Sequence, residues 1–373
     1  FSGAGVVMGP GASTLVDCII EENTADDSGA GLFAYGSGRG VVSRCTFRNN
    51  RCEREDGDGA GGGALIIESD FTVLDCTFED NTADFGGGLF AIKSTSTLQS
   101  CTFTDNVANG SGGGIASLQA DITVRQCAFN GNRAGQFGGA MVNNVASPRI
   151  DKCVFYGNAA VEQSGGGIAS FGPEAGGEGL SSAPVVVNCV FASNQARVFG
   201  GGILNNRAEP VITNCTVYGN VAGGYGGGIA SISSTALVTN CIVWENDLDQ
   251  IYNVLGDTTA TYCAVQGGYD GQGNIAPSGI GLADPGERDF HLLPDSPCVN
   301  AGTNTSPEAF GRVVLDFEGD LRAGRYDIGV DEVPDAGEGE GEGEGEGEGE
   351  GEGEGEGEGE GEGEGEGEGE GEG

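Results

Sequence analysis

A six-residue phrase returns along the chain at a nearly constant interval, and this repeat limits the fold more than any other feature. The phrase is a cysteine, any residue, an apolar residue, two variable residues and an asparagine, as in CTFEDN from Cys76. Most copies lie 25 to 27 residues apart, with single intervals of 31, 36 and 22 residues. A fixed period of this length indicates that one structural unit stacks on the next. Copies begin at Cys18, Cys45, Cys76, Cys101, Cys127, Cys153, Cys189, Cys215 and Cys241, with a decayed copy, CAVQGG, at Cys263.

A glycine-rich phrase lies between successive copies, and the two phrases together predict short strands. It reads GGG or GGA followed by small or apolar residues, for example GGGIAS from Gly112. Runs rich in Val, Ile, Phe and Thr that are bounded by Gly and Asn are typical of strands and turns. No run in the unit has the length or the 3.6-residue period of a helix. A coil of one period brings each strand beside its own copy, ~4.8 Å further along.

These features predict an all-β fold, a right-handed parallel β-helix, which is a single-stranded solenoid of about ten to eleven coils. A propeller blade needs a longer period of ~40–45 residues. The phrase of leucine-rich repeats and the nine-residue period of the calcium-binding roll are both absent. We assign residues 1–293 to the β-helix, 294–333 to a C-terminal closing segment and 334–373 to a disordered acidic linker.

The recurring residues are expected to have structural roles inside each coil. Residues i and i+2 of a strand point the same way, so the Cys and the apolar residue two places later share the interior face. We expect the asparagine to occupy the turn in the left-handed conformation, with amides bonded along the column. The glycine triplets mark bends that leave no room for a Cβ. The ladder consists of Cys76, Cys101, Cys127, Cys153, Cys189, Cys215 and Cys241, of Asn81, Asn106, Asn132, Asn158, Asn194, Asn220 and Asn246, and of Phe47, Phe78, Phe103, Phe129, Phe155 and Phe191.

The twelve cysteines suggest a disulfide framework or a metal site, and neither fits a linear column. In-register parallel neighbours hold their Cβ atoms ~4.8 Å apart, wider than the ~3.8 Å of a disulfide. We therefore expect the ten ladder cysteines to be buried free thiols that act as small hydrophobes. Zinc needs clustered Cys or His ligands, and the chain has a single histidine. Cys52 and Cys298 lie off the ladder, and nothing in the sequence assigns them a partner.

The charge of the chain excludes two classes of partner. The formal net charge is −41; removing the 18 glutamates of the Glu-Gly repeats at Glu338–Gly373 leaves −23 on the rest. A field of this sign repels nucleic-acid phosphates and anionic lipid, so we expect neither as a partner. No apolar run approaches the ~20 residues that span a bilayer. The repeats lack apolar side chains, which predicts a solvated, extended spacer.

Both ends of the chain interrupt a pattern. Phe1 enters a coil partway, and the Glu-Gly repeats stop without a terminating sequence. We therefore expect a segment of a longer protein, in which missing targeting signals carry no weight. A strand edge left uncovered at the first coil would favour end-to-end association, so we expect a monomer when the ends are capped.

The two phrases resemble the FxxN and GGA[ILV] motifs of the chlamydial polymorphic outer membrane proteins. FxxN occurs six times with Phe, and GGA occurs from Gly62 and from Gly138. The resemblance covers roughly residues 1–246 and implies a β-helical passenger on a cell surface. The chain departs from that family because its C-terminal membrane barrel is absent, which puts the same export route in doubt.

The next stretch resembles the ending of bacterial surface proteins of the choice-of-anchor Q type. It comprises NCIVWEN, TYCAVQGGYDGQGNI, DFHLLPDSPCVNAG and DFEGDLRAGRYDIGVDE, over about residues 240–333. This resemblance implies a right-handed β-helix that is secreted or attached to the cell surface, with no assigned chemistry.

An enzyme is the alternative, because right-handed β-helices often carry pectate lyases and glycoside hydrolases. The phrases of the polygalacturonases are missing, His291 has no glycine neighbours, and Asp26-Asp27 is an isolated acidic pair. Two acidic loops offer the closely spaced oxygen ligands that calcium favours. We expect no cofactor, with calcium as the alternative at these loops. The calcium candidates are Glu55, Asp56 and Asp58 in one loop, and Asp316, Glu318 and Asp320 in the other.

The leading interpretation is a non-enzymatic, secreted or cell-surface stalk of the adhesin-like kind that binds glycans weakly. It depends on three features: a ladder of repeats that carries no catalytic motif, the stretch that resembles choice-of-anchor Q proteins, and the acidic Glu-Gly spacer. The alternative is a pectate-lyase-like polysaccharide lyase or a glycoside hydrolase that acts in a groove along the coils. A purely structural envelope component is the third hypothesis. Carbohydrate or an envelope component is the expected partner, and we predict no catalytic residues.

Overall fold

A computed structural model describes residues 5–36, 38–54, 57–174, 181–304, 315–322 and 324–334. The chain divides into two units, Phe1–Val333 and Pro334–Gly373. Apart from Pro334, the second unit lies outside the described residues, and so does the predicted spacer. Within the described ranges, no helix combines the length and the apolar character that a bilayer crossing requires.

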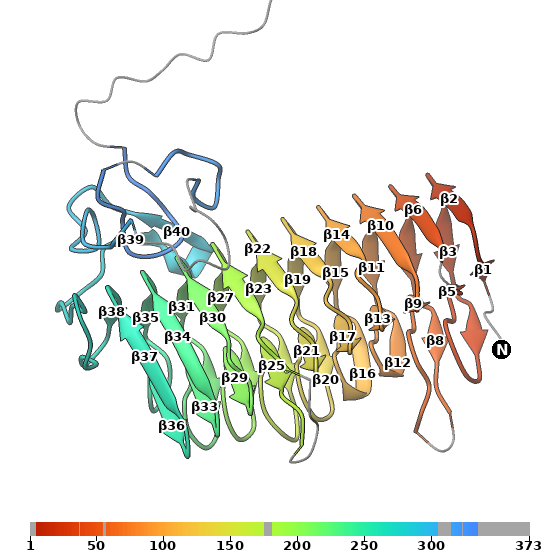
Figure 1. Ribbon diagram of the computed structural model, residues 1–373, viewed down its shortest axis with the longest axis horizontal. Helices are drawn as coiled ribbons and strands as arrows, with labels where there is room; N and C mark the ends of the chain where they lie inside the picture. Colours follow the sequence, from red (N-terminus) through yellow and green to blue (C-terminus); the bar gives the residue numbers. More distant parts are fainter. Residues whose placement is uncertain are drawn as a thin grey trace, which may run out of the picture. The chain divides into compact units, whose positions relative to one another are not determined.

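The first unit winds as a parallel β-solenoid, in which each turn of the chain adds one strand to every sheet (Figure 1). Sheets A, B and C have ten strands each and sheet D has eight. All pairs within these sheets are parallel and join residues one coil apart, for example Phe78 with Phe103. The described coils number about ten, as the repeat predicts.

The strands are short, because the chain turns after every two to five residues. Sheet A contains β1 (Val6–Met8), β5 (Leu32–Tyr35), β9 (Ala64–Ile67), β13 (Leu89–Ile92), β17 (Ile115–Leu118), β21 (Met141–Asn144), β25 (Ile168–Phe171), β29 (Ile203–Asn206), β33 (Ile229–Ile232) and β36 (Ile251–Val254). Sheet B contains β2 (Ala12–Val16), β6 (Arg39–Ser43), β10 (Asp70–Leu74), β14 (Thr97–Gln99), β18 (Thr123–Arg125), β22 (Arg149–Asp151), β26 (Val185–Val187), β30 (Val211–Thr213), β34 (Thr235–Thr239) and β37 (Asp257–Thr261).

The six-residue phrase forms sheet C and enters sheet D. Sheet C contains β3 (Ile19–Glu21), β7 (Thr46–Arg48), β11 (Thr77–Glu79), β15 (Thr102–Thr104), β19 (Ala128–Asn130), β23 (Val154–Tyr156), β27 (Val190–Ala192), β31 (Thr216–Tyr218), β35 (Ile242–Trp244) and β38 (Ala264–Val265). Sheet D contains β4 (Thr24–Ala25), β8 (Arg51–Cys52), β12 (Thr82–Phe85), β16 (Val107–Ser111), β20 (Arg133–Ala134), β24 (Ala159–Ala160), β28 (Gln195–Ala196) and β32 (Val221–Ala222).

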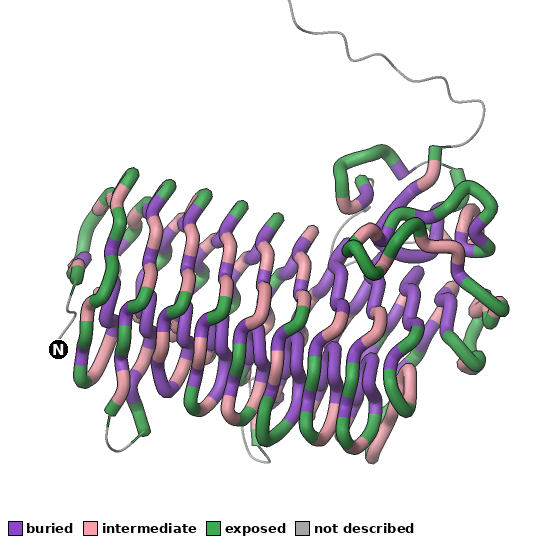
Figure 2. Tube along the Cα trace, turned by 180° about the vertical axis from the view of Figure 1, so that it is seen from behind, coloured by how far each residue is buried: buried purple, intermediate pink, exposed green. Residues whose placement is uncertain are grey.

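The interior is filled by columns of identical side chains. The rings of the phenylalanine column stack with centroids 4.6–4.9 Å apart and interplanar angles of 7° or less. Valines at 217, 243 and 265 continue the column in the last coils, and all three are buried. Figure 2 shows buried residues recurring at equivalent positions of successive coils. The register of the column follows from the coil period, since one strand spacing matches the stacking distance of the rings.

The asparagine column is a continuous hydrogen-bonded ladder. Each side-chain Nδ2 donates to the Oδ1 of the asparagine one coil further on, as in the 2.9 Å bond from Asn132 to Asn158. That Oδ1 also accepts the backbone N–H of Asn132 at 3.0 Å. The ladder runs from Asn23 to Asn246 and ends at Gln250, whose Oε1 accepts the last amide.

The conformational role predicted for the asparagines is wrong in one respect. The left-handed residue of the turn is the one before the asparagine, for example Asp80 (φ 53°), Asp105 (φ 52°) and Gly131 (φ 65°). The asparagine itself points inward, where its amide bonds a backbone N–H and a backbone C=O of the preceding coil. A turn that needs a positive φ and a buried amide therefore uses two adjacent residues for the two tasks.

The glycine triplets bend the chain where neighbouring coils touch. A Cβ on Gly113 would lie 2.3 Å from the carbonyl oxygen of Gly139 in the next coil. Gly112, the first residue of the same triplet, has φ +73°, which L side chains rarely adopt. The triplet thus serves both close approach and turn geometry.

All twelve cysteines lie in the described ranges, and all are free thiols. Cys18 is half-buried rather than buried, because nothing in the described residues covers the first coil. Burial raises the pKa of Cys52 to about 11 and that of Cys298 to about 12. Cys52 packs in a small cluster with Ala25 and Ala83.

Thiol accessibility is a direct check on this packing. Because the thiolate is the reactive species, burial and a raised pKa both suppress reaction. We expect a disulfide reagent at pH 8 to modify Cys18 alone in the folded chain and all twelve cysteines in denaturant. Absorbance of the released thiolate measures the count. Rapid modification of several thiols without denaturant would contradict the buried column.

The last strand of the parallel sheets ends at Val265, and residues 266–293, which the sequence assigned to the β-helix, add to these sheets only an isolated parallel bridge between Ile275 and Ala264. They instead lead to an antiparallel pair, β39 (Leu282–Asp284) and β40 (Asp289–Leu292), joined by the 3₁₀ turn η1 (Pro285–Glu287). The pair packs on the outward side chains of sheet C, where the ring of Phe290 meets that of Tyr218 at 5.9 Å. Figure 1 shows this segment beside β23, β27 and β31.

Candidate functional site

The outer face of sheet A is apolar, which is unusual for the solvent side of a solenoid. Strand alternation points Leu89 and Ala91 of β13 inward and Phe90 and Ile92 outward. The outward positions form two rows along the coils. One row is Phe90, Ala116, Val142, Ala169, Leu204 and Ala230, and the other is Ile92, Leu118, Asn144, Phe171, Asn206 and Ile232.

Aromatic side chains flank these rows. Phe137, which precedes the Gly-Gly-Ala phrase at Gly138, meets the edge of Phe171 with centroids 4.8 Å apart and an interplanar angle of 72°. Further along the same face, the rings of Tyr225 and Tyr252 stack at 4.6 Å. Phe90, Phe137 and Phe171 pack against the buried row yet keep part of each ring in solvent.

A groove of about 770 Å³ follows this face, and we call it the sheet A groove. It crosses the coils from β13 to β29, a length of ~19 Å at one strand spacing per coil. Its polar groups include the amides of Gln136 and Asn144 and the pair Arg207–Glu174, whose Nη2 and Oε1 atoms are 4.0 Å apart. The lining residues are Asp58, Ala60, Phe85, Phe90, Ile92, Ser111, Ala116, Ser117, Leu118, Gln136, Phe137, Val142, Asn144, Val145, Phe171, Gly172, Glu174 and Arg207.

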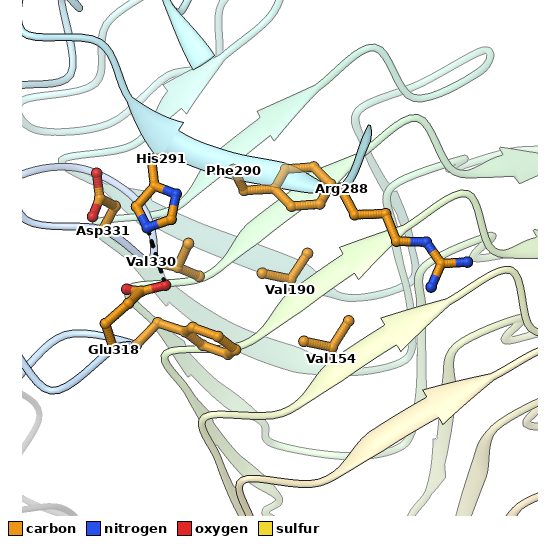
Figure 3. A pocket seen from close by; sticks show the side chains of 9 residues that line it. Val154, Val190, Arg288, Phe290, His291, Glu318, Val330 and Asp331 are labelled. Atoms are coloured by element: carbon orange, nitrogen blue, oxygen red, sulfur yellow. Dashed lines mark ion pairs between the residues drawn. The ribbon is translucent and has the colours of Figure 1, made fainter. Parts of the chain in front are cut away.

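A second constellation lies where the closing segment covers sheet C. His291 of β40, Glu318 and Asp331 each offer one ligand atom, and these atoms lie within 4.8 Å of one another. The Nε2 of His291 is 3.4 Å from the Oε1 of Glu318 (Figure 3). The Nδ1 of His291 is 2.5 Å from the Oδ1 of Asp289. Asp331 is buried, and its Oδ2 accepts the N–H of Leu292 at 2.7 Å.

The electrostatics of this cluster favour a cation. The hydrogen bond that His291 donates to Asp289 raises the pKa of His291, and burial raises the pKa of Glu318 and of Asp331. The neighbouring charge of Asp316 adds to the upward shift of the Glu318 pKa. Carboxylates with raised pKa values are crowded and poorly solvated, so positive charge placed among them is stabilised.

The cavity beside this cluster is small. It has a volume of about 80 Å³ and is lined on one side by Val154, Val190, Phe290, Phe317 and Val330. Figure 3 shows the valines and Phe290 below and beside the imidazole. A space of this size holds an ion with a few waters but not a sugar ring, so the cluster is suited to ion binding rather than to polysaccharide chemistry.

The structure separates the predicted calcium ligands. Asp316 is buried and uses its carboxylate on backbone N–H groups, with Gly319 and Asp320 both 2.8 Å from its Oδ1. Glu318 turns toward His291, whereas Asp320 is exposed. The three residues therefore do not converge on one ion. Asp58 is exposed at the edge of the sheet A groove, and Glu55 and Asp56 lie outside the described residues.

His291 and Asp331 were missed as a pair by sequence reasoning. They lie 40 residues apart and belong to no repeated phrase, so no periodic signal connects them. The one available signal was the single histidine within an acidic context. The acidic pair of the first coil has a simpler role, because Asp27 forms an ion pair with Arg54 at 2.9 Å.

Comparison with known proteins bears on the fold. No curated protein matches the chain. Among solved structures, the chain is similar to full-length QnrB1, a plasmid-mediated fluoroquinolone resistance protein, at 13% identity over 72% of this chain and 94% of that chain, with a TM-score of 0.23. A trypsin-treated variant of QnrB1 gives 13% identity over 72% and 92% of the two chains, with a TM-score of 0.20. Scores this low carry no argument about this chain.

The family comparison agrees with the coils. The model described as right handed beta helix region matches residues 1–136 and 68–273, which together cover well over half of the chain. The matched residues contain the parallel sheets A to D, and the match ends close to the last coil at Val265. The chain therefore belongs to the right-handed β-helix family.

Proposed function

We propose that the chain is a non-enzymatic β-helical stalk, secreted or displayed on a bacterial cell surface, whose sheet A groove binds a neutral glycan weakly. The main observation in support of glycan binding is the sheet A groove, in which partly exposed phenylalanines lie beside amide groups. Aromatic faces pack on the apolar faces of sugar rings, while amides donate and accept hydrogen bonds with hydroxyls. The resemblance of the ending to choice-of-anchor proteins supports surface attachment.

The charge of the body favours a neutral ligand over an acidic one. Outside the Glu-Gly repeats the chain carries −23, so an acidic polysaccharide meets repulsion unless cations bridge it. Among the described groove residues the charged groups are Asp58, Glu174 and Arg207, and two of these three pair with each other. The groove thus offers stacking and hydrogen bonding more than charge.

Replacement of Phe171 by Ala tests the proposal. Loss of the partly exposed ring removes a stacking surface worth about 1 kcal/mol, so we expect glycan affinity to fall roughly fivefold. Affinity electrophoresis of the full chain in gels that contain neutral or acidic polysaccharides provides the measurement. Thermal unfolding of the same variant reports whether the coil remains folded.

Tyr35 supplies the matched control. It lies on β5 of the same sheet, is 40% exposed and stacks on Phe33 at 5.2 Å, but it lies outside the groove. Tyr35→Ala should leave retardation unchanged. No retardation by any neutral polysaccharide, or equal retardation of wild type and Phe171→Ala, would refute the groove assignment. New chain ends or unsaturated products during incubation would instead support the alternative, a polysaccharide lyase or hydrolase.

A further inference from the structure

We propose that His291, Glu318 and Asp331 bind one divalent transition-metal ion, with Zn²⁺ as the type ion. The three ligands come from separate parts of the closing segment, namely β40, the 315–322 stretch and the stretch that ends at Pro334. One imidazole nitrogen with two carboxylate oxygens is a ligand set typical of zinc and its neighbours. This site is independent of the sheet A groove, which lies on another sheet.

The spacing of the ligands fits an ion of this size. Ligands at ~2.0–2.2 Å from a tetrahedral ion are about 3.4 Å from one another. The Nε2 of His291 and the Oε1 of Glu318 are 3.4 Å apart, and all three ligand atoms lie within 4.8 Å. A small movement of exposed Glu318 closes the remaining distance, because its side chain is 39% exposed.

The second independent observation is the contact behind the imidazole. Asp289 accepts a hydrogen bond from the Nδ1 of His291, with the two atoms 2.5 Å apart. In the neutral imidazole this bond places the proton on Nδ1, so Nε2 presents its lone pair to the Glu318 carboxylate. A carboxylate behind a ligating histidine is the arrangement that orients such ligands for metal.

Asp331 distinguishes this site from a cluster of acidic residues on the surface, because its carboxylate is buried and held in place. Only 7% of the residue is exposed, and its Oδ2 is held by the N–H of Leu292, so the carboxylate has a fixed position. One of its carboxylate oxygens lies within 4.8 Å of the ligand atoms of His291 and Glu318. The cavity of about 80 Å³ beside the three ligands provides room for water as a fourth ligand. The ion would thereby join three segments of the closing region.

Glu318→Gln is the decisive variant, since it removes one ligand charge at an exposed position and should not disturb folding. The full chain, stripped of metal with a chelator, is titrated with ZnCl₂ while the ring protons of its single histidine are followed by NMR. In wild type we expect these resonances to move and saturate at one equivalent. Glu318→Gln should weaken this binding at least a hundredfold, and Asp289→Asn should weaken it 10- to 100-fold.

The carboxylates of the acidic tail and the thiols are also zinc ligand types, so the titration needs a matched control. Asp295→Asn removes one exposed carboxylate from the same segment and should bind Zn²⁺ like wild type. CaCl₂ at the same concentration should leave the histidine resonances in place, because calcium prefers oxygen ligands in larger number. Zinc binding that leaves the imidazole signals of wild type unmoved, or equal affinities of wild type and Glu318→Gln, would overturn the proposal. Neither result depends on glycan binding.

Discussion

Replacing Asn132 with Ala is expected to destabilise the coils by about 4 kcal/mol. The side-chain Oδ1 of Asn132 accepts from the backbone N–H and the Nδ2 of Asn106, and its Nδ2 donates to the oxygens of Phe103 and Asn158. All of these groups are buried, and each lost hydrogen bond costs about 1 kcal/mol. The backbone N–H of Asn106 is left without an acceptor, which adds to the cost.

Urea unfolding followed by far-UV circular dichroism measures this loss. The neighbouring residue Arg133 is exposed on β20, so Arg133→Ala serves as the control and should change the free energy of unfolding by less than about 0.5 kcal/mol. Because each coil contacts only its neighbours, the defect should also lower cooperativity between the two halves of the solenoid. An Asn132→Ala chain as stable as Arg133→Ala would show that the ladder contributes little to stability.

The second large effect is expected at Arg322, which anchors the closing segment. Its side chain has no exposed surface, and its Nη2 donates to the carbonyl oxygens of Gly329 and Val330 at 3.0 and 2.8 Å. Its Nη1 lies 3.1 Å from the Oε2 of Glu332. Arg322→Met leaves the carboxylate of Glu332 buried without its cation, a loss of about 3–5 kcal/mol.

This loss should be local, because the strands of sheets A to D pair with one another and not with the closing segment. We expect Arg322→Met to release the segment beyond Val265 at a lower temperature than the coils unfold. Limited proteolysis of the full chain, with the fragments identified by mass, measures the release. The double variant Arg322→Met/Glu332→Gln should regain much of the stability, since it removes the unpaired charge. Arg197→Met, at an exposed arginine directly after β28, is the control. Cleavage of the coils and the closing segment at the same temperature would contradict local release.

The repetitive part of the fold could be predicted because its information is local and is repeated in every coil. The interval between Cys76 and Cys101 determines the coil length, and the alternation of Cys and Phe determines which face is interior. A copy that departs from the phrase does not obscure the pattern, because the other copies still show it. The conformation of the Asn turn was assigned to the wrong residue, because both Asp80 and Asn81 tolerate a positive φ and only the backbone separates their roles.

The closing segment resisted prediction because its contacts are unique rather than repeated. No pattern in the sequence indicates that the ring of Phe290 packs on that of Tyr218. Nor does any pattern indicate that the carboxylate of Asp316 accepts hydrogen bonds from backbone N–H groups. The last strand of the parallel sheets ends at Val265, and no repeated phrase in residues 266–293 indicates the path that follows it. Packing against sheet C, not local propensity, determines their path.

The sequence by itself determined the coil, its period and the identity of each interior column, since stacking identical residues at one strand spacing satisfies packing and hydrogen bonding together. Only the tertiary structure decided where function could reside. The sheet A groove needs outward residues from Phe90 to Phe171 in adjacent coils, and the cation cluster needs His291, Glu318 and Asp331 from three segments. Such sites arise from side chains that are distant along the chain, and no local pattern encodes the distance between them.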